Sequence, residues 1–315
     1  MVSSSNSVHD VVMIGAGPSA LAAAIYTTRE DIDTVLYEKG VVGGMAAITD
    51  KVDNYPGFPS GIEGMKLAGE LQAQAERFGA KIEYGEISEI RDKGSTKVVV
   101  VDGKPVESKA ILVATGSDYN KIGVPGESEY YGRGVHYCAT CDGAFYRGKK
   151  LAVVGGGNSA IQEALFLTRF TSHIDLLVRS TVKASEVLQH ELQDYIREGK
   201  ITLHLATSID EIIATDNMVS GVKVTHDGQQ RTIDVDGVFV FVGLKPNTEF
   251  LKDSAVELDE QGLVKTNSKL ETSLPGVFAS GDVRSGATMQ IASAVGEGAA
   301  AALAIREYLE DLKRG

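Results

Sequence analysis

The chain opens on a short apolar run followed by a glycine turn and a segment with helical spacing. Residues 11–14 are apolar β-formers, residues 15–20 (GAGPSA) form the turn, and an Ala- and Leu-rich segment continues to about Arg29. A second apolar run follows at 34–37. Such runs, bounded by glycine and separated by a helical pattern, predict a strand–helix–strand unit with parallel strands.

The same pattern recurs 140 residues later. A strand is expected over 151–154, a turn over 155–160 (GGGNSA), a helix from 161 to about 170 and a strand over 174–178. Two copies of this arrangement are typical of two dinucleotide-binding βαβ units. The sequence therefore predicts an α/β protein with two Rossmann-like domains, of the three-layer ββα type.

The segments between and after these units are mixed in pattern. The expected elements are a helix over 65–79, strands within 81–101 that turn at 92–94, a buried strand over 110–116, an antiparallel meander around 200–242 and a helix over about 290–309. The uncharged run 11–28 is long enough to raise the question of a membrane span. Gly15, Gly17 and Pro18 interrupt it, so a strand, a turn and a helix explain it better.

The first glycine turn has the spacing that phosphate binding needs. Gly15 permits the tight turn, Gly17 lets the backbone approach a pyrophosphate, and Ala20 is small enough for the helix to pack on the strand. Glu38 ends the second strand, 23 residues after Gly15, where a carboxylate can bind an adenosine ribose. This site could hold FAD or NAD; the alternatives are an ordinary glycine turn and a solvated charge.

The second turn carries Gly155 and Gly157, with Asn158 and Ser159 opening its helix. Its second strand ends in a cation, Arg179, 24 residues after Gly155. A cation at that position suits a ribose 2′-phosphate, so this site could hold NADP. A solvated arginine at a strand end is again the simpler alternative.

Composition narrows the class of protein. The length of 315 residues suggests two domains. The 31 basic and 43 acidic residues give a net charge of −12 and a pI of about 5.0, which disfavours nucleic acid and anionic membranes as partners. Residues 1–10 are serine-rich and lack the basic start of a secretory signal, so we expect a disordered lead-in and a cytoplasmic protein.

The two cysteines, Cys138 and Cys141, are separated by two residues and followed by Asp142. A pair this close can open and close a small disulfide ring, with the carboxylate as general acid or base. His136 adds a third zinc ligand type, but a structural zinc site needs four. Redox chemistry is favoured, with no metal expected; incidental buried thiols are the remaining alternative.

Taken together, these motifs resemble the low-molecular-weight thioredoxin reductase family over about residues 11–309. The landmarks are Gly15 with Glu38, segment 54–58 (NYPGF), 114–116 (ATG), 138–143 (CATCDG), 155–160 (GGGNSA) with Glu163 and Ala164, 243–248 (GLKPNT) and 279–282 (ASGD). The CATCD segment directly before a second glycine turn is very specific.

The resemblance implies a homodimer with an FAD-binding domain formed by residues 1–117 and 248–315. The inserted domain, 118–247, would carry the dithiol and the second nucleotide fold, and the two would rotate about hinges near 116–117 and 243–247. Cys141 would face the flavin, Cys138 would attack the thioredoxin disulfide, and Asp142 would donate a proton. The residues implied to contact FAD are Gly15, Gly17, Pro18, Ser19, Glu38, Gly43, Gly44, Met45, Asn54, Ala114, Thr115, Gly116, Gly281, Asp282, Gln290 and Ile291.

The sequence departs from the family at the NADPH site. Where relatives have His-Arg-Arg and a further Arg, this chain has one arginine, Arg179, with Lys183 nearby. Lysine does not replace the planar arginine fork on a phosphate, so NADPH binding should be weak or absent, as in relatives that take electrons from ferredoxin. Met45, Met289 and His136 are further departures, near the expected flavin edge or dithiol.

The resulting prediction is an FAD-dependent disulfide reductase acting on thioredoxin or a similar protein. A basic cluster, Arg147, Lys149 and Lys150, lies near the dithiol and could dock an acidic donor such as ferredoxin; a solvated loop is the simpler explanation. Two other functions stay open at this stage. One is a dithiol oxidase that passes electrons through flavin to oxygen, and the other is a non-catalytic flavin redox sensor.

Overall fold

The computed structural model describes residues 8–49 and 51–314 and divides into two compact units. The outer unit is Met1–Asp118 with Lys245–Gly315, and the inserted unit is Tyr119–Leu244. The chain leaves and re-enters the outer unit in β7 (Ser117–Tyr119) and β16 (Leu244–Pro246), which pair with each other. Among the described residues, no helix is both long and apolar enough to cross a membrane.

The outer unit is built on a sheet of order β3-β2-β1-β6-β5-β4, with β17 also paired to β6. Its strands are β1 (His9–Ile14), β2 (Thr34–Glu38), β3 (Lys81–Tyr84), β4 (Ile87–Asp92), β5 (Lys97–Val101), β6 (Lys104–Val113) and β17 (Val277–Ala279). β1 pairs in parallel with β2 and β6, whereas β4, β5 and β6 form an antiparallel meander. Both faces of the central strands are buried in apolar clusters.

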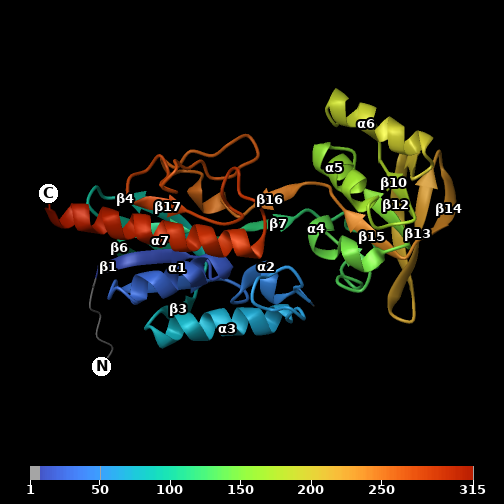
Figure 1. Ribbon diagram of the computed structural model, residues 1–315. Coiled ribbons are helices and arrows are strands. Elements are labelled where there is room, and N and C mark those ends of the chain that lie inside the picture. The colour runs from blue at the N-terminus through green and yellow to red at the C-terminus, as the bar shows by residue number, and fades with distance from the viewer. Residues whose placement is uncertain (1–7, 50, 315) are drawn as a thin grey trace. The chain divides into compact units, whose positions relative to one another are not determined.

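Helices cover one face of this sheet. α1 (Pro18–Thr28) lies between α7 (Ile291–Arg314) and α3 (Gly64–Arg77), as Figure 1 shows. The short α2 (Gly44–Ala47) and the 3-10 helix η2 (Glu249–Leu251) complete the unit's helices among the described residues. α1 begins where expected because Pro18 suits the first helical position, and its Ala-rich sequence allows it to be buried almost throughout.

The start of the first strand differs from the sequence prediction. Part of the expected disordered lead-in, residues 1–7, lies outside the described residues, but β1 already begins at His9 rather than at residue 11. The ring Nδ1 of His9 lies 2.7 Å from a carboxylate oxygen of Asp33, and Lys109 donates to Asp10 at 2.7 Å. These polar pairs extend the strand beyond its apolar part, so the apolar pattern alone placed its start too late.

The inserted unit has three layers. Its parallel sheet has the order β11-β10-β9-β15-β8, helices cover one face, and the antiparallel sheet β12-β13-β14 covers the other. The strands are β8 (Val135–His136), β9 (Lys150–Val154), β10 (His173–Leu177), β11 (Ile201–His204), β12 (Thr207–Thr215), β13 (Met218–His226), β14 (Gln229–Asp234) and β15 (Gly237–Val240). The helices are α4 (Ala139–Asp142), η1 (Gly143–Tyr146), α5 (Asn158–Leu167) and α6 (Glu186–Arg197).

The predicted meander over 200–242 was too long. Only β12, β13 and β14 form it; β11 and β15 pair in parallel with the central sheet instead. β15 is buried at every position, as expected of a strand covered on both faces rather than one with a solvated side. Both units are therefore α/β folds with a parallel sheet, in agreement with the predicted fold class.

Candidate active site

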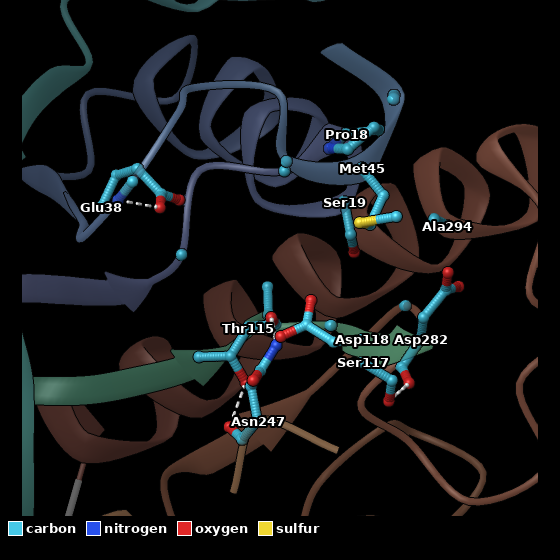
Figure 2. Close-up of a pocket in the computed structure, with 18 of the residues that line it drawn as sticks. Pro18, Ser19, Glu38, Met45, Thr115, Ser117, Asp118, Asn247, Asp282 and Ala294 are labelled. Carbon is cyan, nitrogen blue, oxygen red and sulfur yellow. Dashed lines mark hydrogen bonds between the residues drawn. The ribbon is translucent and has the colours of Figure 1, made fainter. Parts of the chain in front are cut away.

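A cavity of about 330 Å³ lies in the outer unit at the end of β1, next to the first glycine turn. Figure 2 shows Glu38, Pro18 and Met45 on one side of it and Thr115, Asn247 and Asp282 on the other. The walls come from the glycine turn after β1, the start of α1, the end of β2, α2, the segment after β6, the loop after β17 and the N-terminus of α7, so segments distant in sequence meet here. A groove at the carboxyl ends of parallel strands is where such sheets bind ligands.

The glycine turn leaves this cavity open. Gly15 has a φ of +97°, and a Cβ there would lie 2.6 Å from the carbonyl oxygen of Ala114, so only glycine fits. Gly17 caps α1 without a side-chain hydrogen bond, and a Cβ on it would meet open space. The first N–H groups of α1 can therefore bind an anion, because no side-chain hydrogen bond caps the helix among the described residues.

Glu38 is held in place by backbone donors. One carboxylate oxygen accepts from the Ala16 N–H at 2.8 Å, and the other accepts from the Gly40 N–H at 2.7 Å. The carboxylate therefore links the glycine turn to the end of β2. An ionised carboxylate has about four acceptor positions, so Glu38 keeps capacity for two hydroxyl donors.

Asp282 carries the strongest electrostatic perturbation of the cavity. Burial, and secondly the nearby Glu297, raise the pKa of its carboxyl to about 6. The backbone carbonyl of Asp282 accepts from the Ser117 hydroxyl at 2.6 Å. This link fixes the loop after β17 to the start of β7, and the Asp282 side chain lines the cavity.

Most of the residues implied by the family resemblance line this cavity. They are Gly15, Gly17, Pro18, Ser19, Glu38, Gly44, Met45, Ala114, Thr115, Gly116, Gly281, Asp282 and Ile291. Gly43, Asn54 and Gln290 do not. Gly43 has a packing reason for being glycine, since a Cβ would lie 2.3 Å from that of Ala68 in α3. Asn54 donates to the Gln290 side chain at 3.0 Å, so these two side chains pair with each other.

Sequence reasoning missed several wall residues. Thr115 donates to the Asn247 carbonyl at 2.8 Å, and the Asn247 amide donates to the Thr115 carbonyl at 3.2 Å. Ser280 shares a buried 2.6 Å hydrogen bond with Ser19. Both Asn247 and Ser280 lie in landmark segments that pointed to the family, which was the available signal. The other missed residues are Lys39, Gly40, Val41, Ala46, Ile48, Ser117, Asp118 and Ala294.

A second cavity, about 640 Å³, lies in the inserted unit at the second glycine turn. Gly155, Gly157, Asn158, Ser159 and Arg179 all line it, as do Lys121 and Lys183. None of the described residues that line it is acidic, so the cavity suits an anion. Arg179 is its single arginine, however, and the Asn158 side chain accepts from the Ser185 N–H at 2.8 Å.

The cysteines form a disulfide at the start of α4. The Cα atoms of Cys138 and Cys141 are 5.3 Å apart, and both residues are half-buried. Asp142 follows directly, and one of its carboxylate oxygens lies 3.1 Å from Nδ1 of His136. Within residues 8–49 and 51–314, no group of three or more His, Cys, Asp or Glu side chains is arranged to hold a metal ion.

Comparisons with known proteins agree with this geometry. Residues 9–298 match the model of the pyridine nucleotide-disulphide oxidoreductase family. The chain is 40% identical to a thioredoxin reductase of Listeria innocua, over 99% of this chain and 97% of that one, and 39% identical to one of Bacillus subtilis, over 98% of each. The crystal structure of thioredoxin reductase from Streptococcus pyogenes superposes with a TM-score of 0.92 at 37% identity, covering 98% of this chain and 100% of that one.

These matches span both glycine turns and the cysteine pair, and they confirm the resemblance predicted from the sequence. The chain therefore belongs to the pyridine nucleotide-disulphide oxidoreductase family and is an oxidoreductase whose relatives are the low-molecular-weight thioredoxin reductases.

Proposed function

We propose that the outer-unit cavity binds FAD. Glu38 would accept hydrogen bonds from the ribose hydroxyls, and the uncapped start of α1 would bind the pyrophosphate. Asp282 would face the polar chain that joins the pyrophosphate to the flavin. The open space at Gly17 supports this, because it leaves the backbone free for a close approach. When bound, FAD supplies two-electron transfer between a donor and a disulfide.

The Cys138–Cys141 disulfide beside Asp142 is the observation that carries the proposed activity. We propose that the reduced pair passes two electrons to the disulfide of thioredoxin or a thioredoxin-like protein. Cys138 is the attacking thiol, Cys141 resolves the mixed disulfide, and Asp142 supplies the proton that the leaving sulfur needs. We place this chemistry in a reducing compartment such as the cytoplasm, and expect a homodimer.

The electron donor is a separate proposal: NADPH binds weakly or not at all. A ribose 2′-phosphate would find Arg179 and the point charges of Lys121 and Lys183 in the second cavity. Lysines lack the two-pronged guanidinium, and each missing charge-assisted hydrogen bond costs about 1.5–3 kcal/mol. Two missing arginines would therefore weaken NADPH binding by several orders of magnitude.

A small acidic electron carrier such as ferredoxin is the alternative donor. Arg147, Lys149 and Lys150 are all exposed and lie close to the cysteine pair in sequence. The guanidinium of Arg147 lies 5.2 Å from the ring centre of Phe170, and the Lys149 ammonium lies 5.6 Å from that of Tyr146. The aromatic rings therefore help to hold a positive patch on an otherwise acidic chain, which favours docking of an acidic partner.

The activity is tested with dithionite-reduced enzyme and oxidised thioredoxin. Wild type should reduce thioredoxin, whereas Cys138→Ser should lose turnover and keep its flavin absorbance. Thr140→Ser, an exposed change between the same cysteines, is the matched control and should be fully active. Unchanged turnover of Cys138→Ser would refute the dithiol mechanism.

The same preparation decides between the other functions. Peroxide release on addition of a small dithiol would indicate an oxidase that uses oxygen, and a reduced flavin that never passes its electrons to any disulfide would indicate a redox sensor. Stopped-flow mixing of oxidised enzyme with NADPH, NADH or reduced ferredoxin tests the donor. Fast flavin bleaching by micromolar NADPH would contradict the proposal that the second cavity binds NADPH weakly or not at all.

A further inference from the structure

Three polar side chains close to the cysteine pair in sequence, Asp142, His136 and Tyr146, form a connected polar chain. Nδ1 of His136 lies 3.1 Å from Oδ2 of Asp142, and Nε2 lies 2.7 Å from the hydroxyl of Tyr146. The exposed fractions of His136 and Tyr146 are only 7% and 5%. A buried imidazole with partners on both ring nitrogens has a fixed position next to the carboxyl group.

Aromatic packing restricts the side chains of His136 and Tyr146 in this polar chain. The His136 ring stacks on Phe239 at 5.1 Å between ring centres, and Tyr146 meets Phe239 edge-on at 5.6 Å. Gly237 makes room for the phenol, because a Cβ there would lie 2.5 Å from Cε1 of Tyr146. His136 and Tyr146 therefore have little freedom to rotate away from Asp142.

We infer that His136 is the positioning residue of Asp142. During disulfide exchange it returns a proton to Asp142 after that carboxyl group has donated its own. This inference rests on the proposed dithiol function. The geometry accommodates either protonation state of the imidazole. In the neutral ring, Nδ1–H donates to Asp142 and the Tyr146 hydroxyl donates to Nε2. In the charged ring, Nε2–H donates to the Tyr146 oxygen instead, so both ring nitrogens keep a polar partner in either state.

The electrostatic surroundings of His136 are defined by a few groups. Asp142 from α4 and Tyr146 from η1 are its direct polar partners. Burial and the charges of Asp142 and Asp236 raise the pKa of Tyr146, so the phenol stays protonated and can donate or accept. The Lys149 ammonium lies on the Tyr146 ring at 5.6 Å from its centre. Phe239, from β15, contributes no charge.

Disulfide exchange consumes protons, so a group that can return a proton to Asp142 is useful. The Cys138 thiolate bonds to one partner sulfur as the partner's S–S bond breaks, and the departing sulfur takes the proton of Asp142. Cys141 then gives its proton to Asp142 and attacks Cys138, and the second partner sulfur leaves with that proton. Two electrons have moved from the cysteine pair to the partner. Asp142 ends the cycle deprotonated, with His136 in position to return a proton to it.

The test compares two disulfides that differ in their need for an acid. The cysteine pair of the holoenzyme is reduced with a phosphine, desalted and mixed in single turnover with oxidised thioredoxin or with DTNB. The thiolate that leaves DTNB is stable without a proton. His136→Asn, which keeps an N–H group but cannot carry a second proton, should slow the thioredoxin reaction about 10- to 100-fold near pH 8 and leave the DTNB reaction unchanged.

The pH profile provides a second readout. The ratio of the thioredoxin rate to the DTNB rate cancels the thiolate fraction of Cys138. If His136 returns the proton to Asp142, removing the imidazole removes a proton source that the thioredoxin reaction needs and the DTNB reaction does not. The fall of this ratio with rising pH should therefore move to lower pH in His136→Asn. Tyr146→Phe, which removes only the hydroxyl, should give a smaller move in the same direction.

His204→Asn is the matched control. His204 also pairs with a buried carboxylate, Asp175 at 2.6 Å, but it lies in β11, at the opposite edge of the sheet from β8, which carries His136. It should behave as wild type. Equal slowing of both disulfides by His136→Asn, or no slowing of either, would overturn the inference while leaving the dithiol function standing. A wild-type pair that reduces neither disulfide would overturn both.

Discussion

Replacing a glycine of α7 by alanine gives a sharp test of how the outer unit is packed. A Cβ at Gly298 would lie 2.1 Å from the carbonyl oxygen and 2.9 Å from the carbonyl carbon of Ser19 in α1. Ordinary contacts begin at 3.4 Å, so the two helices would have to separate by about 1.3 Å. Gly296, two residues earlier in the same helix, is exposed and has nothing within 4 Å of such a Cβ.

The two substitutions should change stability in opposite directions. Both gain about 1 kcal/mol because alanine favours helix over glycine. In Gly298→Ala this gain is outweighed by overpacking, which costs about 1–3 kcal/mol and more when the obstacle is backbone. At about 2–4 °C per kcal/mol, we expect Gly296→Ala to raise the melting temperature by a few degrees and Gly298→Ala to lower it.

The assay is thermal unfolding of the two apoproteins, followed by titration with FAD. Ser19 bonds to Ser280 at 2.6 Å, and both line the cavity, so displacing α7 should also weaken FAD binding in Gly298→Ala. Gly296→Ala should bind FAD as wild type does. If both variants melted higher than wild type and bound FAD equally, the close helix contact and its link to the cavity would be refuted.

Three further predictions concern the two cavities. Glu38→Gln should weaken FAD binding about 10- to 100-fold in equilibrium dialysis, because charge-assisted bonds contribute about 1.5–3 kcal/mol; equal affinity would exclude Glu38 from the site. Because the pKa of Asp282 is raised to about 6, its favourable contribution to apoprotein stability is complete below about pH 4 and is lost as the pH rises through 6. Urea unfolding should therefore show the free energy of unfolding of Asp282→Asn rising relative to that of wild type by about 3 kcal/mol between about pH 3 and pH 8, and a constant difference would contradict it. Ser180→Arg should lower the KM for NADPH at least tenfold, restoring a second guanidinium, with the KM for NADH as control; a parallel change in both would argue against 2′-phosphate recognition.

The sequence predicted the parts of the fold and site that depend on local pattern. The two glycine turns, Glu38 and Arg179 lie where the spacing placed them, because turn, helix start and strand end follow one another within a single βαβ unit. The predicted meander includes residues 237–240, whereas they pair in the structure with β9, more than 80 residues earlier in the chain. Pairing over that distance leaves no periodic trace in the strand itself.

Residue roles were harder to predict than residue positions. Gly43 matches a family position, but the spacing of a motif does not show its packing, in which a Cβ would lie 2.3 Å from that of Ala68. From the sequence, His136 is a departure from the family and a third possible zinc ligand, and neither indicates its contact with Asp142. Its partner Phe239 is about 100 residues away, and Tyr146 is required to complete the polar chain. Such a network depends on three segments meeting, which the sequence does not specify.

The split construction of the outer unit has a consequence for its synthesis. β17 and α7 come from the C-terminal segment, yet β17 pairs with β6 and α7 packs on α1. When residue 244 has been synthesised, all strands of the inserted unit, 119–244, are present. In residues 8–118, however, the face of α1 that packs on α7 and the edge of β6 that pairs with β17 are still uncovered. Domains fold as units in the order in which they are completed. The middle of this chain is thus ready to fold before its beginning is.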